Sequence, residues 1–141
     1  MSTAATAHYK SNLRDILFNL FEVLEIGNTT LGRGPFEAFD EETARTTLAN
    51  YEEFCVRELS PSFAETDRVP LQFDGEGNVR TPKGYKEAWN ALKDGGWLAV
   101  SAPSELGGGG MPFTMAMALS EMMCGASMAF MMYPGLSAGA A

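Results

Sequence analysis

The chain has 141 residues, a length that suits one domain rather than two. Hydrophobic residues make up 45% of it and charged residues 20%, so the composition favours a packed globular core and disfavours disorder. Because 18 acidic residues outnumber 10 basic ones, the net charge of -8 disfavours binding to nucleic acid or to an anionic membrane surface.

The residue types that most often build reactive or metal sites are scarce. The two cysteines, Cys55 and Cys124, are far apart and form no CxxC or metal-ligand spacing, so we expect reduced, mostly buried thiols. The only histidine, His8, lies in a segment, residues 1–10, that is expected to be a loose tail. We therefore expect no metal site. Residues 1–7 lack the apolar core of a secretory signal, and a cytoplasmic location is expected.

The first half of the chain predicts two helices. Apolar residues recur at helical spacing from Leu13 to Leu24, and Gly27 is expected to end this first helix. Residues 28–39 are rich in Gly, Thr and Pro and are expected to form a loop. Asp40 can cap a second helix that Pro61 ends. The predicted buried face of this second helix consists of Ala44, Leu48, Tyr51, Cys55 and Leu59.

The middle of the chain predicts a short excursion and a third helix. Near residues 69–80, two short apolar runs flank Asp74–Asn78, which is typical of a small two-stranded hairpin. Thr81–Pro82 is typical of a helix start, and Gly95–Gly96 of a helix end. The predicted buried face of this helix consists of Tyr85, Ala88, Trp89 and Leu92.

The last third is the most apolar part. A loop with four glycines, Gly107–Gly110, is expected to lead to a buried helix over Pro112–Cys124; Gly125 is expected to break it, and Ser127 to cap a fifth helix. Met122–Ala141 carries no charge and is long enough to span a bilayer, but its glycines and proline favour a buried helix pair over a membrane anchor. Such helices need a cover, so we expect a partner chain or further polypeptide to shelter them.

Three features of this region could carry chemistry, and each has a simpler interpretation. The glycine run could cradle a phosphate, but no Lys-Ser/Thr follows it, which favours a turn where backbones pass closely. Eight methionines lie between Met111 and Met132, and their helical spacing favours a deformable apolar wall over a copper site. Glu121 could accept a proton, but a carboxylate held by a helix N-terminus or by an arginine such as Arg45 or Arg57 is simpler.

Gly96–Trp97 is followed by a short apolar run and by Pro103–Gly110, which reads Pro-Ser-Glu-Leu-Gly-Gly-Gly-Gly. This order resembles a signature of the acyl-CoA dehydrogenase family, in which a glycine-rich turn leads to two buried helices. The front of the chain resembles the extra N-terminal segment of longer members, including the methylmercaptopropionyl-CoA and bacterial long-chain types. The segments that carry this second likeness are His8–Asn12, Arg14–Asp15, Asn19–Glu22, Asp40–Arg45 and Ser62–Arg68.

The resemblance implies an all-α fold of about five helices. Residues 1–39 would be an N-terminal extension with one helix, and residues 40–141 the family's N-terminal α-domain, incomplete at its C-terminus. In the family a β-domain and a C-terminal helical bundle follow, with FAD between them. A carboxylate base from the bundle removes the α-proton of an acyl-CoA, and the β-hydride goes to the flavin. The resemblance also implies a homo-oligomeric full-length protein that acts in fatty acid β-oxidation.

The same resemblance implies what this chain contributes. By position, Phe130, Pro134 and Ala138 match the face of the family's N-terminal domain that lines the acyl pocket, with Met131 and Tyr133 as weaker neighbours. No residue matches the catalytic base, a flavin ligand or a metal ligand. We therefore expect no dehydrogenase activity and no stable FAD binding from the chain alone. The alternative is a non-catalytic helical module that docks its apolar end onto a partner protein.

Overall fold

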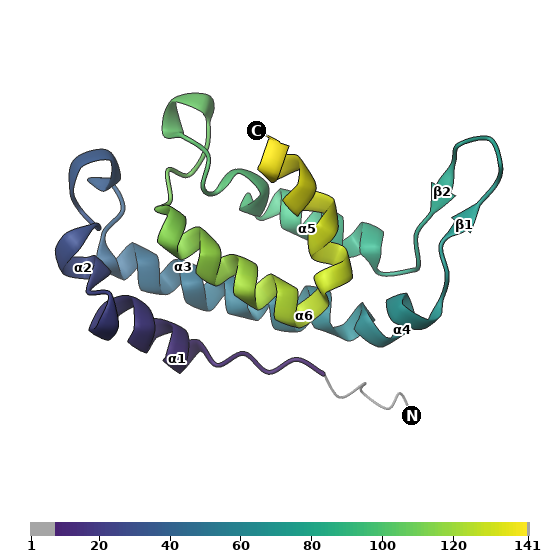
Figure 1. Ribbon diagram of the computed structural model, residues 1–141, viewed down its shortest axis with the longest axis horizontal. Helices are drawn as coiled ribbons and strands as arrows, with labels where there is room; N and C mark the ends of the chain where they lie inside the picture. The colour runs from purple at the N-terminus through teal and green to yellow at the C-terminus, as the bar shows by residue number, and fades with distance from the viewer. Residues whose placement is uncertain (1–7, 141) are drawn as a thin grey trace.

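The computed structural model describes residues 8–140, apart from the side chain of Ala138, and it is built almost entirely of helices (Figure 1). The helices α3 (Glu41–Phe54) and α6 (Phe113–Ala140) lie side by side, and α1 (Leu13–Leu17) packs against α3. The prediction of an all-α fold with a small hairpin is confirmed. The other elements are α2 (Ile26–Thr29), α4 (Phe63–Arg68), β1 (Gln72–Phe73), β2 (Val79–Arg80) and α5 (Tyr85–Asp94).

The first helix forms where predicted but ends differently. It continues from α1 as a π-helical turn, Phe18–Val23, and Glu25 with φ 48° then takes the left-handed conformation. Gly27, which was predicted to do so, lies inside α2. A Cβ atom on Gly27 would come within 2.6 Å of Glu41 Oε2, so this glycine permits a close approach to α3. The predicted loop over residues 28–39 therefore includes the end of α2.

The second helix confirms its predicted cap and core. The backbone N–H of Thr43 donates to Asp40 Oδ1 at 2.7 Å, and all five predicted core positions are buried. Its predicted end at Pro61 is wrong, because π-helical (Cys55–Leu59) and 3-10 (Ser60–Ser62) turns carry the chain on into α4. Pro61 lies in the first turn of the 3-10 segment, where its missing N–H would have had no helical partner.

The predicted hairpin is also confirmed. The strands β1 and β2 pair antiparallel, with Gln72 opposite Arg80 and Phe73 opposite Val79, and they project from the helices (Figure 1). The next helix, α5, ends at Gly95–Gly96 as predicted but begins at Tyr85, after Gly84. Gly84 adopts φ 98°, and its N–H donates to Glu87 Oε2 at 3.0 Å, so this contact replaces the cap expected at Thr81.

The helix α6 consists of two arms. Ser127, with φ -164° and ψ 94°, interrupts the helical backbone and separates the first arm (residues 113–126) from the second arm (residues 128–140). Ser127 Oγ accepts a hydrogen bond from Phe130 N at 3.3 Å, so the predicted serine cap is confirmed. The predicted break at Gly125 is displaced by two residues. In Figure 1 the second arm, in yellow, turns back along the molecule.

The first arm is part of the core. Met115, Leu119 and Met122 in this arm are buried, as are the core positions of α3 that it faces. Among the described residues, the segment Phe113–Ser137 is the one helix long and apolar enough to cross a membrane, and 44% of its most hydrophobic window is buried. Core packing therefore accounts for the apolar character of the first arm.

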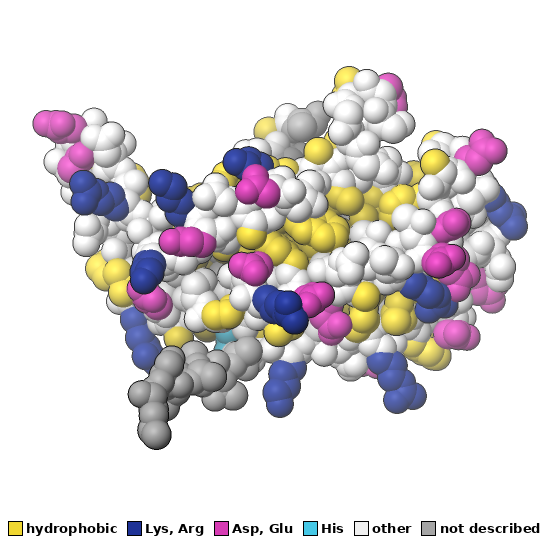
Figure 2. All heavy atoms as spheres, turned by 180° about the vertical axis from the view of Figure 1, so that it is seen from behind, with side chains coloured by type: hydrophobic (Ala, Val, Ile, Leu, Met, Phe, Trp, Pro, Cys, Tyr) yellow, Lys and Arg dark blue, Asp and Glu magenta, His cyan; other side chains and the backbone are white. Residues whose placement is uncertain are grey.

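Apolar side chains also reach the surface. Figure 2 shows hydrophobic atoms gathered across the middle of one face, with acidic and basic groups on either side. On the second arm, Met128, Met132 and Leu136 are spaced four residues apart and are 55%, 47% and 68% exposed. This exposed apolar stripe agrees with the prediction that the end of the chain needs a cover.

Candidate functional site

The glycine-rich turn brings two stretches of backbone into direct contact. Gly109 N donates to Ala99 O at 3.0 Å, and Gly110 N donates to Ala102 O at 2.9 Å. A Cβ atom on Gly108 would lie 2.1 Å from Ala102 O, and one on Gly109 would lie 2.6 Å from a backbone oxygen, that of Val100. The interpretation of this run as a turn where backbones pass closely is thus confirmed.

The same hydrogen bonds show that the turn does not fit a phosphate or the diphosphate of FAD. Gly107 N donates to Ser104 O and Gly108 N to Pro103 O, both at 3.0 Å, and the next two glycine amides are also bonded to carbonyls. A phosphate cradle needs backbone N–H groups that point at the ligand. No flavin contact is assigned to this turn.

The turn ties the Trp97 segment to the start of α6, and a groove lies between this segment and the second arm. Met111 N donates to Val100 O at 3.1 Å, which ties the start of α6 to this segment. The Trp97 ring packs against Tyr51 of α3, edge to face, with ring centroids 4.8 Å apart. The groove is open and mostly apolar, and it is lined by Tyr51, Leu92, Trp97, Leu98, Val100, Ser101, Ala116, Leu119, Ser120, Met123, Met131, Pro134 and Gly135.

The size of the groove indicates part of a site. Its volume is about 120 Å³. A complete pocket for a small molecule measures roughly 300–1,000 Å³. Its few polar atoms are not free for specific chemistry, since the Ser120 hydroxyl already donates to Ala116 O at 2.9 Å. The groove can therefore shield an apolar group from water but cannot enclose one.

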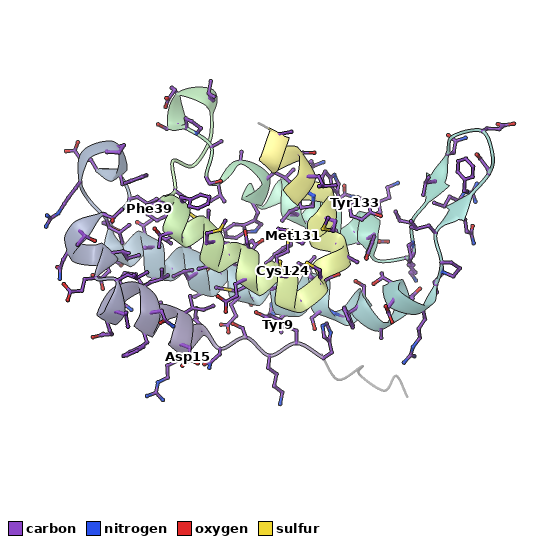
Figure 3. All side chains as sticks on the ribbon, viewed as in Figure 1. Tyr9, Asp15, Phe39, Cys124, Met131 and Tyr133 are labelled. Atoms are coloured by element: carbon purple, nitrogen blue, oxygen red, sulfur yellow. The ribbon has the colours of Figure 1, made fainter. Side chains whose placement is uncertain are left out.

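Two of the three sequence-predicted pocket residues, Pro134 and Phe130, line different cavities. Pro134 lines the groove, as does its neighbour Met131, which Figure 3 places on the second arm. Phe130 is only 2% exposed and lies with Tyr133 on another side of the arm, against Tyr85 of α5. At about 100° per residue, residues 131, 134 and 135 share one helix face and residues 130 and 133 the next. Ala138 follows in the same arm, but its side chain lies outside the described part of the structure.

Comparison of the sequence with protein families gives a match over residues 41–141 to the acyl-CoA dehydrogenase N-terminal domain. The chain belongs to the acyl-CoA dehydrogenase family. It is 41% identical over 130 residues to the broad-specificity linear acyl-CoA dehydrogenase FadE5 of Mycobacterium tuberculosis. The aligned region covers 92% of this chain and 21% of that protein. It is 31% identical over 134 residues to the 3-methylmercaptopropionyl-CoA dehydrogenase of Ruegeria pomeroyi, and this alignment covers 94% of this chain and 22% of that protein. This acyl-CoA dehydrogenase domain thus spans about a fifth of the length of these relatives.

Sequence reasoning missed half of the groove in the acyl-CoA dehydrogenase domain. Its opposite wall comes from Tyr51, Leu92 and Val100, which lie in three elements far from the second arm in sequence. Periodicity predicts that such residues are buried but not which of them meet across a cavity. The Gly96–Trp97 pair was a local signal, because it marks the segment that lines the groove opposite the arm.

Two interpretations of Glu121 are wrong, namely the buried proton acceptor and the partner of Arg45 or Arg57. Its side chain is exposed, so it is not a carboxylate buried within an apolar helix. Arg45 forms an ion pair with Glu41 at 2.7 Å and Arg57 with Glu53 at 3.0 Å, so each of the two arginines suggested as its partner pairs within its own helix. Periodicity did not reveal that Glu121 lies on the outer side of the first arm.

Burial keeps the two titratable groups near the groove, the Cys55 thiol and the Tyr51 hydroxyl, in their uncharged forms. Cys55 is buried, and burial raises the pKa of its thiol to about 12. Burial also raises the pKa of the Tyr51 hydroxyl well above its usual value. Among residues 8–140, no group of three or more His, Cys, Asp or Glu side chains is placed to hold a metal ion. The chemistry of the groove is therefore that of an apolar surface.

Proposed function

We propose that this chain is the N-terminal part of an FAD-dependent acyl-CoA dehydrogenase that introduces an α,β double bond into a fatty acyl-CoA. Its own contribution is one wall of the acyl pocket. The observation that carries this proposal is the open apolar groove between the second arm of α6 and the Trp97 segment, built on the glycine turn typical of the family. A half-formed wall suits a domain that the rest of a longer protein completes.

The three pocket residues take different parts in this proposal. Pro134, with Met131 beside it, faces the groove and would contact the alkyl chain of the substrate. Phe130 is buried against α5 and would hold the arm in place from behind. Ala138 follows Pro134 by one helical turn and would extend the wall towards the end of the arm.

The contribution to catalysis is physical rather than chemical. In the whole enzyme, a bound flavin would supply the hydride acceptor, and a carboxylate from another domain would supply the base. The groove would exclude water and hold methylene groups by dispersion contacts and apolar burial, at about 0.8 kcal/mol per buried methylene. In this proposal the residues of this chain neither transfer protons nor take part in the redox step.

The exposed stripe of Met128, Met132 and Leu136 supports a second candidate, a non-catalytic module that binds a protein partner. Light scattering distinguishes the two. A discrete complex of the chain with itself or with another protein favours the module, whereas concentration-dependent aggregation favours a domain whose cover lies in the rest of the enzyme.

The decisive experiment has two arms. First, the purified chain is mixed with acyl-CoA and an electron acceptor; we expect no turnover and no bound flavin. Second, residues 8–141 replace the equivalent segment of the Mycobacterium tuberculosis relative, and we expect the chimera to oxidise acyl-CoA. Turnover by the chain alone, with a yellow bound flavin, would contradict its assignment as a non-catalytic part.

The chimera also tests the wall. Pro134→Phe places a larger side chain in the groove and so leaves less room for the acyl chain. The chimera that carries it should therefore prefer shorter acyl chains, with kcat/KM for the longest substrates reduced at least several-fold. The control is Val79→Phe, which adds a ring to an exposed position of the hairpin, outside both the groove and the exposed stripe, and should leave the chain-length profile unchanged. An unchanged chain-length profile in the Pro134→Phe chimera would refute the proposal that the groove is a wall of the acyl pocket.

A further inference from the structure

A second pocket lies on another side of the second arm, away from the groove. Its walls are the rings of Tyr85 and Trp89 from α5 and of Phe130 and Tyr133 from the arm. Thr81 and Lys86 complete its edge, and its volume is about 250 Å³. It shares no lining residue with the groove, so the arm separates two independent cavities.

Three of the four rings of this pocket, those of Tyr85, Phe130 and Tyr133, pack against one another. Tyr85 packs edge to face against Phe130 and against Tyr133, with ring centroids 5.6 Å apart in both pairs and interplanar angles of 79° and 81°. Tyr85 and Phe130 are 7% and 2% exposed, which restricts both side chains to one conformation. The Tyr85 and Phe130 side of the pocket is thus fixed by core packing before any ligand arrives, whereas Tyr133 is 42% exposed and Trp89 is partly buried.

The charge at the edge of the pocket is positive. Lys86 is exposed and forms no ion pair within 4.0 Å in the described part of the chain, whereas Lys93 of the same helix pairs with Asp94 at 3.4 Å. The surface inside the pocket is almost entirely apolar. A ligand that satisfies both features has an apolar body for the rings and an anionic group for the lysine.

We propose that this aromatic pocket binds a small carboxylate whose apolar part is a single aromatic ring or a short alkyl chain. The four rings provide stacking and edge contacts to the apolar part, and the Lys86 ammonium attracts the carboxylate. The volume of about 250 Å³ suits one ring or a chain of similar size. This site does not depend on the proposed dehydrogenase function, because it uses none of the residues that line the groove.

The two tryptophans of the chain make the test direct, since Trp89 lines the aromatic pocket and Trp97 lines the groove. In Trp97→Phe the tryptophan emission comes from Trp89 in the aromatic pocket, and in Trp89→Phe it comes from Trp97 in the groove. The probe is 4-phenylbutyrate, added to each 141-residue variant while tryptophan emission is recorded. We expect a saturable change in Trp97→Phe and none in Trp89→Phe.

The anionic group is tested by a neutral probe and a charge variant. Replacing 4-phenylbutyrate with 4-phenylbutanol, or Lys86 with Gln, should weaken binding roughly 2- to 5-fold, the effect of one exposed ion pair. Lys93→Gln is the matched control on the same helix and should change nothing. Tyr133→Leu removes a half-exposed ring of the wall and should weaken both probes several-fold.

Three results would overturn the proposal: equal emission changes from both tryptophans, no saturation of the Trp89 signal, or equal affinity for the acid and the alcohol in the unsubstituted chain. Circular dichroism of each variant checks that it is folded. If Trp97→Phe does not fold, the chain with both tryptophans still decides the matter, because its response must disappear in Trp89→Phe.

Discussion

The ring of Tyr9 lies directly on Gly125, at a point where the first arm of α6 has no side chain. A Cβ atom on Gly125 would lie 2.5 Å from Tyr9 Cε2, closer than two carbon atoms can approach. In Figure 3 Tyr9 lies beside the same stretch of α6 that carries Cys124. Gly125 was expected to break the helix, but the structure shows that it accepts a ring from the N-terminal segment.

A second contact fixes the same segment. The His8 ring stacks on Phe63 of α4 with centroids 3.9 Å apart and an interplanar angle of 23°. The prediction of a loose tail is therefore wrong for His8 and Tyr9, while residues 1–7 lie outside the described part. Two aromatic contacts attach the segment before α1 to both α4 and α6, close to the kink at Ser127.

The Tyr9–Gly125 contact predicts a strong coupling between the two positions. Gly125→Ala should destabilise the chain by about 1–2 kcal/mol, because the new methyl group displaces the ring. In a Tyr9→Ala background the same change should stabilise it by about 0.5–1 kcal/mol, the ordinary gain of Ala over Gly in a helix. Urea unfolding of the two single variants and the double variant gives the coupling energy.

Gly139→Ala is the control for this cycle. Gly139 lies in the second arm of the same helix, and a Cβ atom there would meet nothing within 4 Å. Its substitution should be neutral or stabilising whether or not Tyr9 is present. Additive effects at Tyr9 and Gly125 would mean that the ring does not rest on the glycine in solution.

The turn glycines provide a prediction on backbone approach. Gly108→Ala should destabilise the domain by about 2–3 kcal/mol, because the new methyl group meets the carbonyl of Ala102 and backbone cannot rotate away as a side chain can. Gly107→Asn is the control: Gly107 has φ 82° with open space around it, and asparagine tolerates this conformation. Thermal melts followed by circular dichroism compare the two, and equal losses would refute the close approach.

Much of this fold could be predicted from local patterns, and the failures share one cause. The stripe of the second helix and the hairpin are local features, so periodicity and turn composition were enough for them. The helix ends at Glu25 and beyond Pro61 were mispredicted because packing decides them: Gly27 lies inside α2 beside the Glu41 side chain, and its neighbours in the sequence do not identify it as an interior residue.

The site was less predictable than the fold. The family resemblance placed Pro134 on the second arm, and the structure puts it in a groove, but it also put Phe130 on the same wall. Residues 130 and 134 are only about 40° apart around the helix, yet the boundary between the two cavities falls between them. That boundary depends on where α5 and the Trp97 segment pack, which is tertiary information.

The cap of α3 provides a prediction with a defined pH dependence. Hydrogen bonds from Thr43 hold the pKa of the Asp40 carboxyl below its usual value, so the ionised form stabilises the helix. This contribution is present above the unfolded pKa, near 3.8, and is lost as the pH falls through the lower folded value. Asp40→Ala should lower Tm by a few degrees at pH 7, whereas Asp40→Asn keeps an acceptor and should lower it less. Equal melting temperatures for Asp40→Ala and the unsubstituted chain would contradict the cap.

The buried thiol of Cys55 provides the final prediction. Burial raises its pKa to about 12 from 9.0, so the folded state keeps this thiol protonated where the unfolded state has ionised. The contribution of the buried Cys55 thiol to stability is complete below about pH 9 and falls as the pH rises towards 12.

At pH 8, iodoacetamide should therefore modify the half-buried Cys124 first and Cys55 only as the chain unfolds. Peptide mass mapping after timed alkylation measures both rates, and Cys55→Ala should unfold with a weaker pH dependence above pH 9. Rapid modification of Cys55 in the folded chain would show that α3 and α6 do not stay packed over it.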